Sequence, residues 1–547
     1  MKNYQKYKRY EPFVLDNRTW PSKFITNAPI WGSVDLRDGN QALPIPMTIE
    51  KKLKMFNHLI KLGFKQIEVG FPYASDTDYN FVRMLIEDKL IPDDVTIIVL
   101  SSCTKECIDK SFEALKGAGT AGIQIYTLCS PAQRKYVIKM SKDELLKYTS
   151  EAAIYTRSIA NKFLDTKFVL GYGPESFTLT EMDFALAVCN SVIYAWEPTI
   201  ENKCMITLPA TVEVAMPNQF ADQVEFIHQN LAMRDRVILG VHTHNDRGTG
   251  IAAAELALLA GAERIEGTLF GNGERTGNLD IVTLALNMYT SGIDPRLDFS
   301  NIEESVMVYE ECTGLKIHIR HPYAGKQVFT AYSGGHQDAI RKGLIYREAS
   351  KEHKWLVPYI PIDPVDIGRN MDSIIQINSQ SGKGGIRYIL EKLLKISLPD
   401  SIQTEFGKYI KMLSDKTSQL LSEEKVVNEF LNRYDLTKYE NNMFYIDSSN
   451  FQDIKIRYKN KKFHLTDLDN NSIENCFNHI KKELNLVDIA INNLDIWNDV
   501  DGRCYSYVQI LSNNGITQDF FGWSYKNTIQ ITVLLMAIER YLNNRKN

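Results

Sequence analysis

Residues 30–290 repeat one unit, in which a short apolar run is followed by a helical pattern. Apolar runs rich in β-branched residues are typical of buried strands, and apolar periodicity in the longer segments is typical of helices. Eight such strands alternating with helices over about 250 residues predict an α/β fold, a (β/α)8 TIM barrel. An open doubly wound sheet is the alternative, but polar motifs after nearly every strand favour a closed barrel. The expected strands are 30–36, 66–70, 95–100, 122–127, 167–172, 204–208, 236–241 and 264–270, and the expected helices include 49–62, 105–116, 141–161 and 181–195.

The chain is too long for a single hydrophobic core. Its 547 residues predict about two to four domains. We expect an N-terminal extension at 1–29, the barrel at 30–300, a linker or helical subdomain at 301–400, and a C-terminal α+β domain at 401–547. The last boundary follows from composition, because Lys, Asn, Asp and Tyr become abundant after about residue 400. Helical patterns at 402–421 and 423–434 and strand-like runs at 451–458 and 462–465 follow it.

Composition excludes several classes of partner. With 24% charged residues and a formal charge of −4, the chain has no surface typical of nucleic-acid or membrane binding. No apolar run reaches the ~20 residues of a membrane-spanning helix, and the basic N-terminus lacks the apolar region of a secretory signal. Eight scattered cysteines without a C-x-x-C pair fit reduced thiols rather than disulfides. We therefore expect a cytoplasmic protein.

The stretch VHTHNDRGTG at 241–250 indicates a metal site. His242 and His244 lie two residues apart at the end of an expected strand, so both imidazoles point to the same face. Two neutral imidazoles on one side of a strand form half of a divalent-metal site, and Asp38 at another strand end would supply an oxygen ligand. A pair of histidines satisfied by water is the alternative.

Polar residues follow most of the expected strands, and they provide a test of the barrel assignment. A barrel gathers its active site at the carboxyl ends of its strands, the barrel mouth. Polar groups far apart in the sequence are therefore expected to converge there. They are Arg37, Asp38, Glu68, Gln124, Glu175, Thr211, His242, His244 and the run GNGERTGN at 271–278.

Five motifs follow one another along the chain: DLRDGNQ at 35–41, IEVGFP at 67–72, LPATVE at 208–213, HTH at 242–244 and GNGERTGN at 271–278. In this order they resemble motifs of the 2-isopropylmalate synthases, which belong to a wider family of metal-dependent, Claisen-type condensing barrels. The resemblance extends almost without a break from about Trp31 to Gln403. It implies an acyltransferase that condenses acetyl-CoA with a 2-oxo acid, first of all 2-oxoisovalerate, and releases 2-isopropylmalate and CoA.

The resemblance also implies which residues bind the metal and the acceptor. Asp38, His242 and His244 would hold a divalent ion, Zn²⁺, Mn²⁺ or Mg²⁺, with Asn278 as a further ligand or a close neighbour. The 2-oxo acid would chelate that ion, which makes its ketone electrophilic, and Thr211 would hydrogen-bond its carboxylate. The residues expected around the substrate are Glu68, Gln124, Gly173, Thr207 and Thr211. For Glu68, pairing with Arg37 to orient it is expected rather than direct catalysis.

Four residues are implied in the chemistry itself. A thioester methyl group is a weak carbon acid, so its deprotonation requires a positioned base and support for the enolate. Glu175 would be that base or its water relay, and Arg37 would stabilise negative charge on the keto oxygen. His336 and Tyr359 match positions after the barrel that act in the relatives from the partner subunit, so they are expected as acid/base helpers in a homodimer.

Five positions depart from the family pattern at sites that line the side-chain pocket for the 2-oxo acid in the relatives. Drift within a leucine-pathway enzyme is one interpretation. The other is a changed acceptor, such as phosphonopyruvate, oxaloacetate or 2-oxoglutarate, because a polar group changes selectivity more than the ~1–3 kcal/mol of one methylene. A metal-dependent lyase or aldolase with the same barrel is a further alternative. The five positions are Gln124, Thr127, Cys129, Gly173 and Thr207.

The C-terminal region resembles the leucine-sensing domain of the same family. A helix at 471–484, a strand at 505–511 and a helix at 528–542 keep its βαβ-like outline. Its glycine-containing turns are lost, because DNNSI stands at 469–473 and FGWS at 521–524, and glycines supply backbone shapes that other residues resist. We therefore predict weak or absent feedback inhibition by leucine, in a domain that still serves dimerisation.

Overall fold

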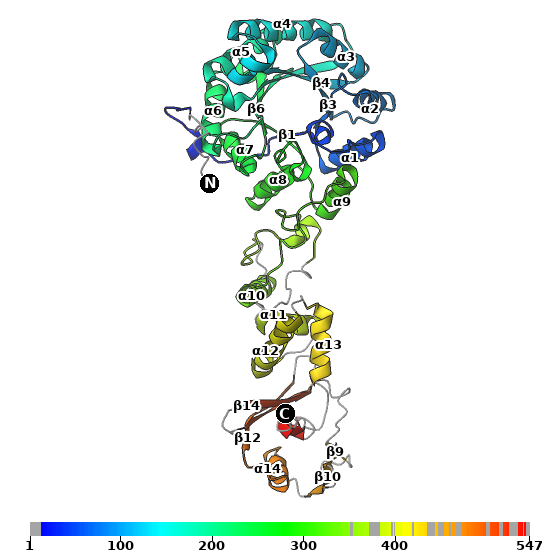
Figure 1. Ribbon diagram of the computed structural model, residues 1–547, viewed down its shortest axis with the longest axis vertical. Helices are drawn as coiled ribbons and strands as arrows, with labels where there is room; N and C mark the ends of the chain where they lie inside the picture. The colour runs from blue at the N-terminus through cyan, green and yellow to red at the C-terminus, as the bar shows by residue number, and fades with distance from the viewer. Residues whose placement is uncertain are drawn as a thin grey trace. The chain divides into compact units, whose positions relative to one another are not determined.

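The computed structural model describes residues 13–350, 354–370, 383–394, 398, 400–417, 421–434, 444–446, 453–458, 461–466, 473–498, 504–512, 518–524, 534–535, 537–539 and 541–542. The chain forms two compact units (Figure 1). The first comprises Met1–Val328 with Ile362–Asn370, and the second comprises Phe329–Pro361 with Met371–Asn547. Of the described residues, none forms a helix long and apolar enough to cross a membrane.

The first unit is built on a closed barrel of eight parallel strands, which confirms the (β/α)8 prediction and excludes the open sheet. The barrel closes between β1 and β8, where Ile30 pairs with Arg264 and Ser33 with Gly267. The strands are β1 (Ile30–Ser33), β2 (Gln66–Gly70), β3 (Thr96–Ser102), β4 (Thr120–Leu128), β5 (Lys167–Glu175), β6 (Cys204–Ala210), β7 (Val237–Thr243) and β8 (Arg264–Gly267).

Helices surround the barrel (Figure 1). Several begin at a side-chain cap, such as Thr48, Ser75, Thr104 or Ser141, whose hydroxyl accepts a hydrogen bond from a backbone N–H of the first turn. These caps fix the point where each connection becomes helical. The helices are α1 (Ile49–Leu62), α2 (Asp76–Glu87), α3 (Lys105–Leu115), α4 (Lys142–Ala160), α5 (Met182–Trp196), α6 (Pro217–Asn230), α7 (Gly250–Leu259), α8 (Ile281–Thr290) and α9 (Ile302–Thr313).

The first and last strands end earlier than the sequence predicts. β1 stops at Ser33 and is followed by a π-helical turn, η3 (Asp35–Gly39), although Leu36 was expected in the strand. β8 stops at Gly267, and a 3-10 turn, η7 (Leu269–Gly271), follows. The Asp35 carboxylate in η3 connects the end of β1 to η7, because it accepts hydrogen bonds from Ser33 Oγ at 2.8 Å and from Leu269 N at 3.0 Å.

The second unit contains helices and two small antiparallel sheets, in agreement with the predicted α+β class. Buried apolar residues of α14 and β13, such as Phe477, Ile480, Val508 and Ile510, form part of its core. Residues 469–472, which carry most of the altered turn, lie outside the described residues, as does part of the predicted helix at 528–542. The helices are α10 (Gly334–Ser350), α11 (Lys383–Leu394), α12 (Asp400–Thr417), α13 (Glu423–Tyr434) and α14 (Ile473–Glu483). One sheet consists of β9 (Phe444–Ile446), β10 (Asp453–Tyr458) and β11 (Lys461–Thr466). The other consists of β12 (Ile489–Asn498), β13 (Cys504–Ser512) and β14 (Gln518–Ser524).

Candidate active site at the barrel mouth

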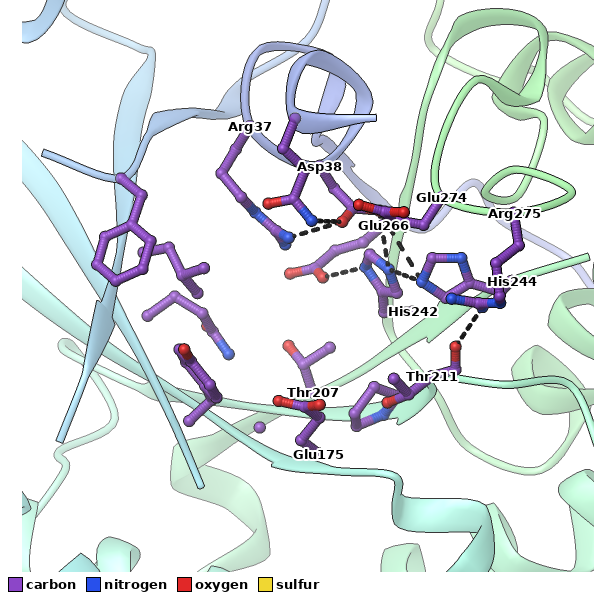
Figure 2. Close-up of a pocket in the computed structure, with 17 residues that line it drawn as sticks. Arg37, Asp38, Glu175, Thr207, Thr211, His242, His244, Glu266, Glu274 and Arg275 are labelled. Carbon is purple, nitrogen blue, oxygen red and sulfur yellow. Dashed lines mark hydrogen bonds and ion pairs between the residues drawn. The ribbon is translucent and has the colours of Figure 1, made fainter. Parts of the chain in front are cut away.

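A cavity of about 270 Å³ lies at the carboxyl ends of the barrel strands. Figure 2 shows Arg37, Asp38 and the two histidines on one side of this space, with Glu175, Thr207 and Thr211 on the opposite side. Most residues predicted for the site therefore converge, as a barrel requires. The predicted residues that line the cavity are Arg37, Asp38, Gln124, Gly173, Glu175, Thr207, Thr211, His242 and His244.

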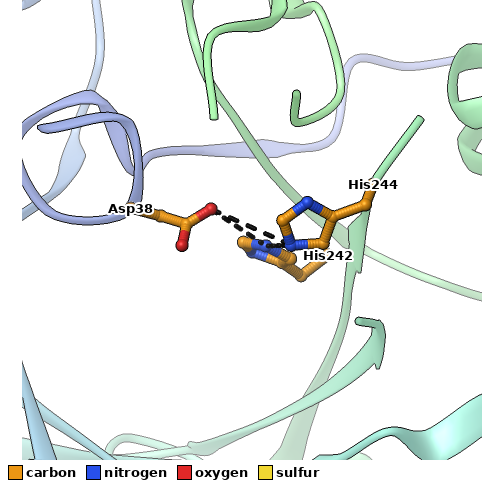
Figure 3. Close-up of side chains that lie close together, drawn as sticks. All are labelled: Asp38, His242 and His244. Atoms are coloured by element: carbon orange, nitrogen blue, oxygen red, sulfur yellow. Dashed lines mark hydrogen bonds and ion pairs between the residues drawn. The ribbon is translucent and has the colours of Figure 1, made fainter. Parts of the chain in front are cut away.

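Asp38, His242 and His244 form a compact, buried set of metal-ligand atoms (Figure 3). Asp38 Oδ2 lies 3.8 Å from His242 Nε2 and 3.9 Å from His244 Nε2, and the two Nε2 atoms are 3.3 Å apart. Ligand atoms placed tetrahedrally around an ion at 2.0–2.1 Å are separated by roughly 3.3 Å. Asp38 Oδ2 is buried without a hydrogen-bond partner among the described residues. The set therefore fits a divalent cation.

The Nδ1 atom of each imidazole faces a hydrogen-bond acceptor of the protein. His242 Nδ1 lies 3.0 Å from Glu266 Oε2, and His244 Nδ1 lies 3.3 Å from the carbonyl oxygen of Gly277. An acceptor on Nδ1 favours the tautomer that leaves the Nε2 lone pair for a metal. Both histidines thus present Nε2 toward Asp38, as metal ligands do.

The electrostatics favour cation binding at Asp38 and His244, whereas at His242 burial lowers the pKa but the hydrogen bond and charge of Glu266 outweigh burial and raise that pKa. Burial raises the pKa of Asp38, but the Arg37 guanidinium and the two histidines outweigh burial and hold that pKa below its usual value. Burial and the neighbouring His242 lower the pKa of His244 to about 4. A carboxylate and a neutral imidazole are the protonation states that bind a metal.

Arg37 is held rigidly beside this set. Its Nη1 donates to Asp38 Oδ1 at 2.9 Å, and its Nη2 and Nε lie 3.1 and 3.0 Å from the carboxylate of Glu68. Glu68 is 2% exposed and stands outside the cavity lining, so it does not form part of the substrate-facing wall. Its carboxylate faces the guanidinium, which agrees with the expected pairing that orients Arg37.

Glu175 is the last residue of β5 and lies on the side of the cavity opposite Asp38 and the two histidines (Figure 2). Its Oε1 accepts a hydrogen bond from Gln133 Nε2 at 3.1 Å, while Gln133 Oε1 accepts from Ser130 N and Oγ. Burial raises the pKa of Glu175 above its ordinary value. A carboxylate with a raised pKa is a stronger base, which suits proton abstraction.

Thr211, directly after β6, offers a hydroxyl donor to the cavity. Its Oγ1 already accepts a hydrogen bond from the backbone N–H of Ser176 at 2.9 Å. The hydroxyl hydrogen can therefore point to an acceptor in the cavity, such as a carboxylate.

Gln124, Gly173 and Thr207 form part of the cavity wall. Gln124 Oε1 and Thr207 Oγ1 are buried and have no hydrogen-bond partner among the described residues. Gly171 makes room for this amide, because a Cβ at that position would lie 1.9 Å from Gln124 Oε1. These two polar atoms are therefore buried within the wall, close to Gly171 and Gly240.

Thr127 and Cys129 do not line the cavity, which corrects their predicted place in the acceptor pocket. Thr127 Oγ1 lies 2.7 Å from the hydroxyl of the buried Tyr172, and Cys129 Sγ lies 3.7 Å from the same hydroxyl. Side chains alternate along a strand, so Gln124 and Tyr126 face the cavity and Thr127 faces away.

Three further predicted residues lie outside the cavity lining. Asn278 is 2% exposed, its Nδ2 donates to the carbonyl of Asn272 at 3.0 Å, and its Oδ1 has no partner among the described residues. His336 and Tyr359 belong to the second unit, where their rings stack with centroids 3.9 Å apart. Tyr359 is 63% exposed.

The structure adds roles for residues that the sequence analysis did not single out. Glu266 holds His242, and Gln41 donates from Nε2 to Asp38 Oδ1 at 3.0 Å. Arg275 connects three loops, because it pairs with Asp246 at 2.7 Å and donates to the carbonyl of Thr211 at 2.6 Å. The signal for Glu266 was available, since it is an acidic residue inside the strand run RIEG at 264–267.

Comparisons with known proteins show what the whole chain is similar to. Residues 28–308 match the HMGL-like family, and residues 326–391 match the family described as alpha-isopropylmalate synthase, post-catalytic domain-like. The chain is 54% identical to a 2-isopropylmalate synthase of Clostridium acetobutylicum over 79% of this chain and 78% of that protein. It is 46% identical to a 2-isopropylmalate synthase of Acetoanaerobium sticklandii over 95% and 93% of the two chains. A solved hydroxymethylglutaryl-CoA lyase from Pseudomonas aeruginosa is 17% identical over 55% of this chain and 97% of that one, with a TM-score of 0.45.

Proposed function

This chain belongs to the 2-isopropylmalate synthase family, and from that membership we propose that it condenses acetyl-CoA with 2-oxoisovalerate to give 2-isopropylmalate and CoA. The enzyme is an acyltransferase, and leucine biosynthesis is the pathway that this product serves. The observation that carries the proposal is the buried set of Asp38, His242 and His244, which faces a cavity shared with Arg37 and Glu175.

The side of the cavity that carries Arg37, Asp38 and the two histidines activates the acceptor, the 2-oxo acid. Asp38, His242 and His244 would hold a divalent metal, which would supply Lewis-acid polarisation of the keto group. Two imidazoles and one carboxylate accept Zn²⁺, Mn²⁺ or Mg²⁺, so metal supply decides among them. Asn278, with its unpartnered Oδ1, stands near this set as a further ligand or neighbour. The Arg37 guanidinium stabilises the negative charge that develops on the keto oxygen.

The opposite wall positions the acceptor and forms the nucleophile. The hydroxyl of Thr211 donates to the carboxylate of the 2-oxo acid, and Gln124, Gly173 and Thr207 surround its side chain. Glu175 removes a proton from the thioester methyl group, directly or through water, and the resulting enolate attacks the keto carbon. Hydrolysis of the thioester then releases CoA and makes the reaction irreversible.

His336 and Tyr359 act as acid/base helpers supplied by the partner subunit of a homodimer. Their place after the barrel and their mutual stacking support a shared role. Mixing Asp38→Ala and His336→Ala subunits tests it, because hybrid dimers would contain one intact site and regain activity. If the mixture stays as inactive as each parent, the two residues do not act across subunits. The free, buried thiols of the described cysteines support a reducing, cytoplasmic location.

The relatives do not favour the alternative functions. Both closely similar proteins named above carry the name 2-isopropylmalate synthase, so phosphonopyruvate, oxaloacetate, 2-oxoglutarate and the lyase or aldolase reaction are set aside. The decisive test follows free CoA with a thiol reagent over a panel of 2-oxo acids. We expect 2-oxoisovalerate to give the highest kcat/KM by a wide margin. A higher value for any other acceptor, or no acceptor-dependent CoA release, would overturn the proposal.

A further inference from the structure

A lysine ammonium is buried beneath the barrel mouth. Lys52, on α1, is 0% exposed, and its Nζ lies 2.5 Å from Asp78 Oδ1 on α2. The same Nζ donates to the carbonyl oxygens of Leu36 at 2.9 Å and Val69 at 3.4 Å. The Lys52 ammonium thus donates to three acceptors and lies outside both the solvent-exposed surface and the cavity lining.

The two carbonyl acceptors lie next to acidic and basic residues of the site in the turn η3 and in the strand β2. Leu36 belongs to η3 and directly precedes Arg37 and Asp38 in the chain, so its carbonyl is part of the peptide group that leads into Arg37. Val69 directly follows Glu68 in β2. One ammonium therefore holds both backbones between which the Arg37–Glu68 ion pair forms.

Asp78 extends this arrangement to the cavity wall. Its Oδ2 accepts a hydrogen bond at 2.8 Å from the backbone N–H of Phe71, a residue that lines the cavity. Gly70 allows this approach, because a Cβ there would lie 2.7 Å from the Asp78 carboxyl group. The pair is thus connected to the chain on both sides of Gly70.

Stability alone does not account for such a pair. Burying two charges is costly, and apolar residues of similar volume often stabilise a core at least as well. What an apolar pair cannot do is donate to the Leu36 and Val69 carbonyls. The contribution specific to Lys52 is therefore the orientation of those two peptide groups.

We propose that Lys52 and Asp78 form a positioning pair, which fixes η3 and the end of β2 so that Asp38 meets the two imidazoles and Arg37 meets Glu68. Neither residue touches the substrate or the metal. The inference rests on the proposed metal site, and it adds the residues that hold that site in register.

Two variants of the full-length protein, Lys52→Met and the double variant Lys52→Met/Asp78→Asn, test the proposal. Comparing them separates the stability lost to an unpaired buried charge from the loss of backbone positioning. Lys52→Met leaves the Asp78 carboxylate buried and unpaired, so its Tm falls. The double variant removes both charges and regains most of that Tm. We expect both variants to bind Mn²⁺, titrated by electron paramagnetic resonance, about tenfold more weakly, as for other outer residues of metal sites. Their kcat falls by a similar factor, while the KM for acetyl-CoA changes little.

Asp222→Asn is the matched control. Asp222 is also buried, and it holds Trp20 and Arg18, which lie outside the cavity lining. Its loss should lower Tm and leave the Mn²⁺ affinity unchanged. If the double variant regains Tm and also shows wild-type Mn²⁺ affinity and kcat, Lys52 and Asp78 are merely structural and the inference is overturned.

A milder variant covers the case in which Lys52→Met does not fold. Asp78→Asn keeps the volume and an acceptor for the Phe71 N–H, but it removes the charge that fixes Lys52. Weaker Mn²⁺ binding and lower kcat at a temperature well below its Tm support the inference, and unchanged values overturn it. The proposed function fails separately, if the wild-type protein itself neither binds Mn²⁺ nor releases CoA.

Discussion

At the scale of single residues, the contact that His242 makes through Nδ1 determines how well its Nε2 can bind a metal. Glu266 accepts from His242 Nδ1 and also pairs with the buried Arg264. Glu266→Gln keeps the volume but removes the charge that holds the imidazole in place. We predict about tenfold weaker metal affinity, measured by competition with a chelator. Glu263→Gln, which changes an exposed ion pair with Arg234, should leave the affinity unchanged, and equal losses in both variants would contradict this role.

A second residue-scale prediction concerns pH. Burial raises the pKa of Glu175, whereas the hydrogen bond from Gln133 lowers it by stabilising the ionised form. A base must be ionised, so kcat/KM should fall as pH decreases through this raised pKa. Gln133→Leu removes the donor, raises the pKa further, and should move the acid limb to higher pH. Gln219→Leu, whose side chain accepts from Met216 N outside the cavity, should not move it. An acid limb that stays in place after Gln133→Leu would show that another group is the base.

At the scale of elements, the loop between β8 and α8 depends on one glycine. Gly277 has φ +102°, and a Cβ there would lie 1.9 Å from the carbonyl oxygen of Gly271. Its own carbonyl faces His244 Nδ1. Gly277→Ala should therefore destabilise the protein by more than the ~1–2 kcal/mol of left-handed strain alone, and it should weaken metal binding.

Gly292→Ala is the control for this prediction, because Gly292 has φ +79° and nothing within 4 Å of the added Cβ. Chemical denaturation and metal titration compare the two variants. If Gly292→Ala costs as much stability as Gly277→Ala, strain rather than the clash in the loop explains the effect.

The element scale also explains which parts of the fold and site the sequence could predict. Alternation of apolar runs and helices predicted the closed barrel, and strand ends predicted Asp38, His242 and His244. The end of β1 was wrong because Val34 and Leu36 are buried and apolar but lie in a turn rather than a strand. Alternation along β4 turns the Thr127 side chain away from the cavity, whereas the family resemblance had put it in the acceptor pocket. Lys52 gave no signal, because a lysine on an amphipathic helix ordinarily reaches solvent.

At the scale of the whole molecule, the described part of the C-terminal region contains the helix α14 and two small sheets, and its sequence departs from the glycine-containing turns expected of a leucine-sensing domain. FGWS at 521–524 lies in the regular strand β14, which pairs with β13 along its length. We predict that millimolar leucine leaves the rate of CoA release essentially unchanged. Dose-dependent inhibition by leucine, with isoleucine inactive as the control, would contradict this expectation.

The central claim is that residues from η3 and from the end of β7 bind one cation at the barrel mouth. Crystals grown with Mn²⁺ and 2-oxoisovalerate, measured at the manganese absorption edge, test it most directly. The anomalous difference map should contain a strong peak within roughly 2.3 Å of Asp38 Oδ2 and of Nε2 in His242 and His244. A peak bound by other residues, or an Asp38 carboxylate turned away from both imidazoles in active crystals, would contradict the account.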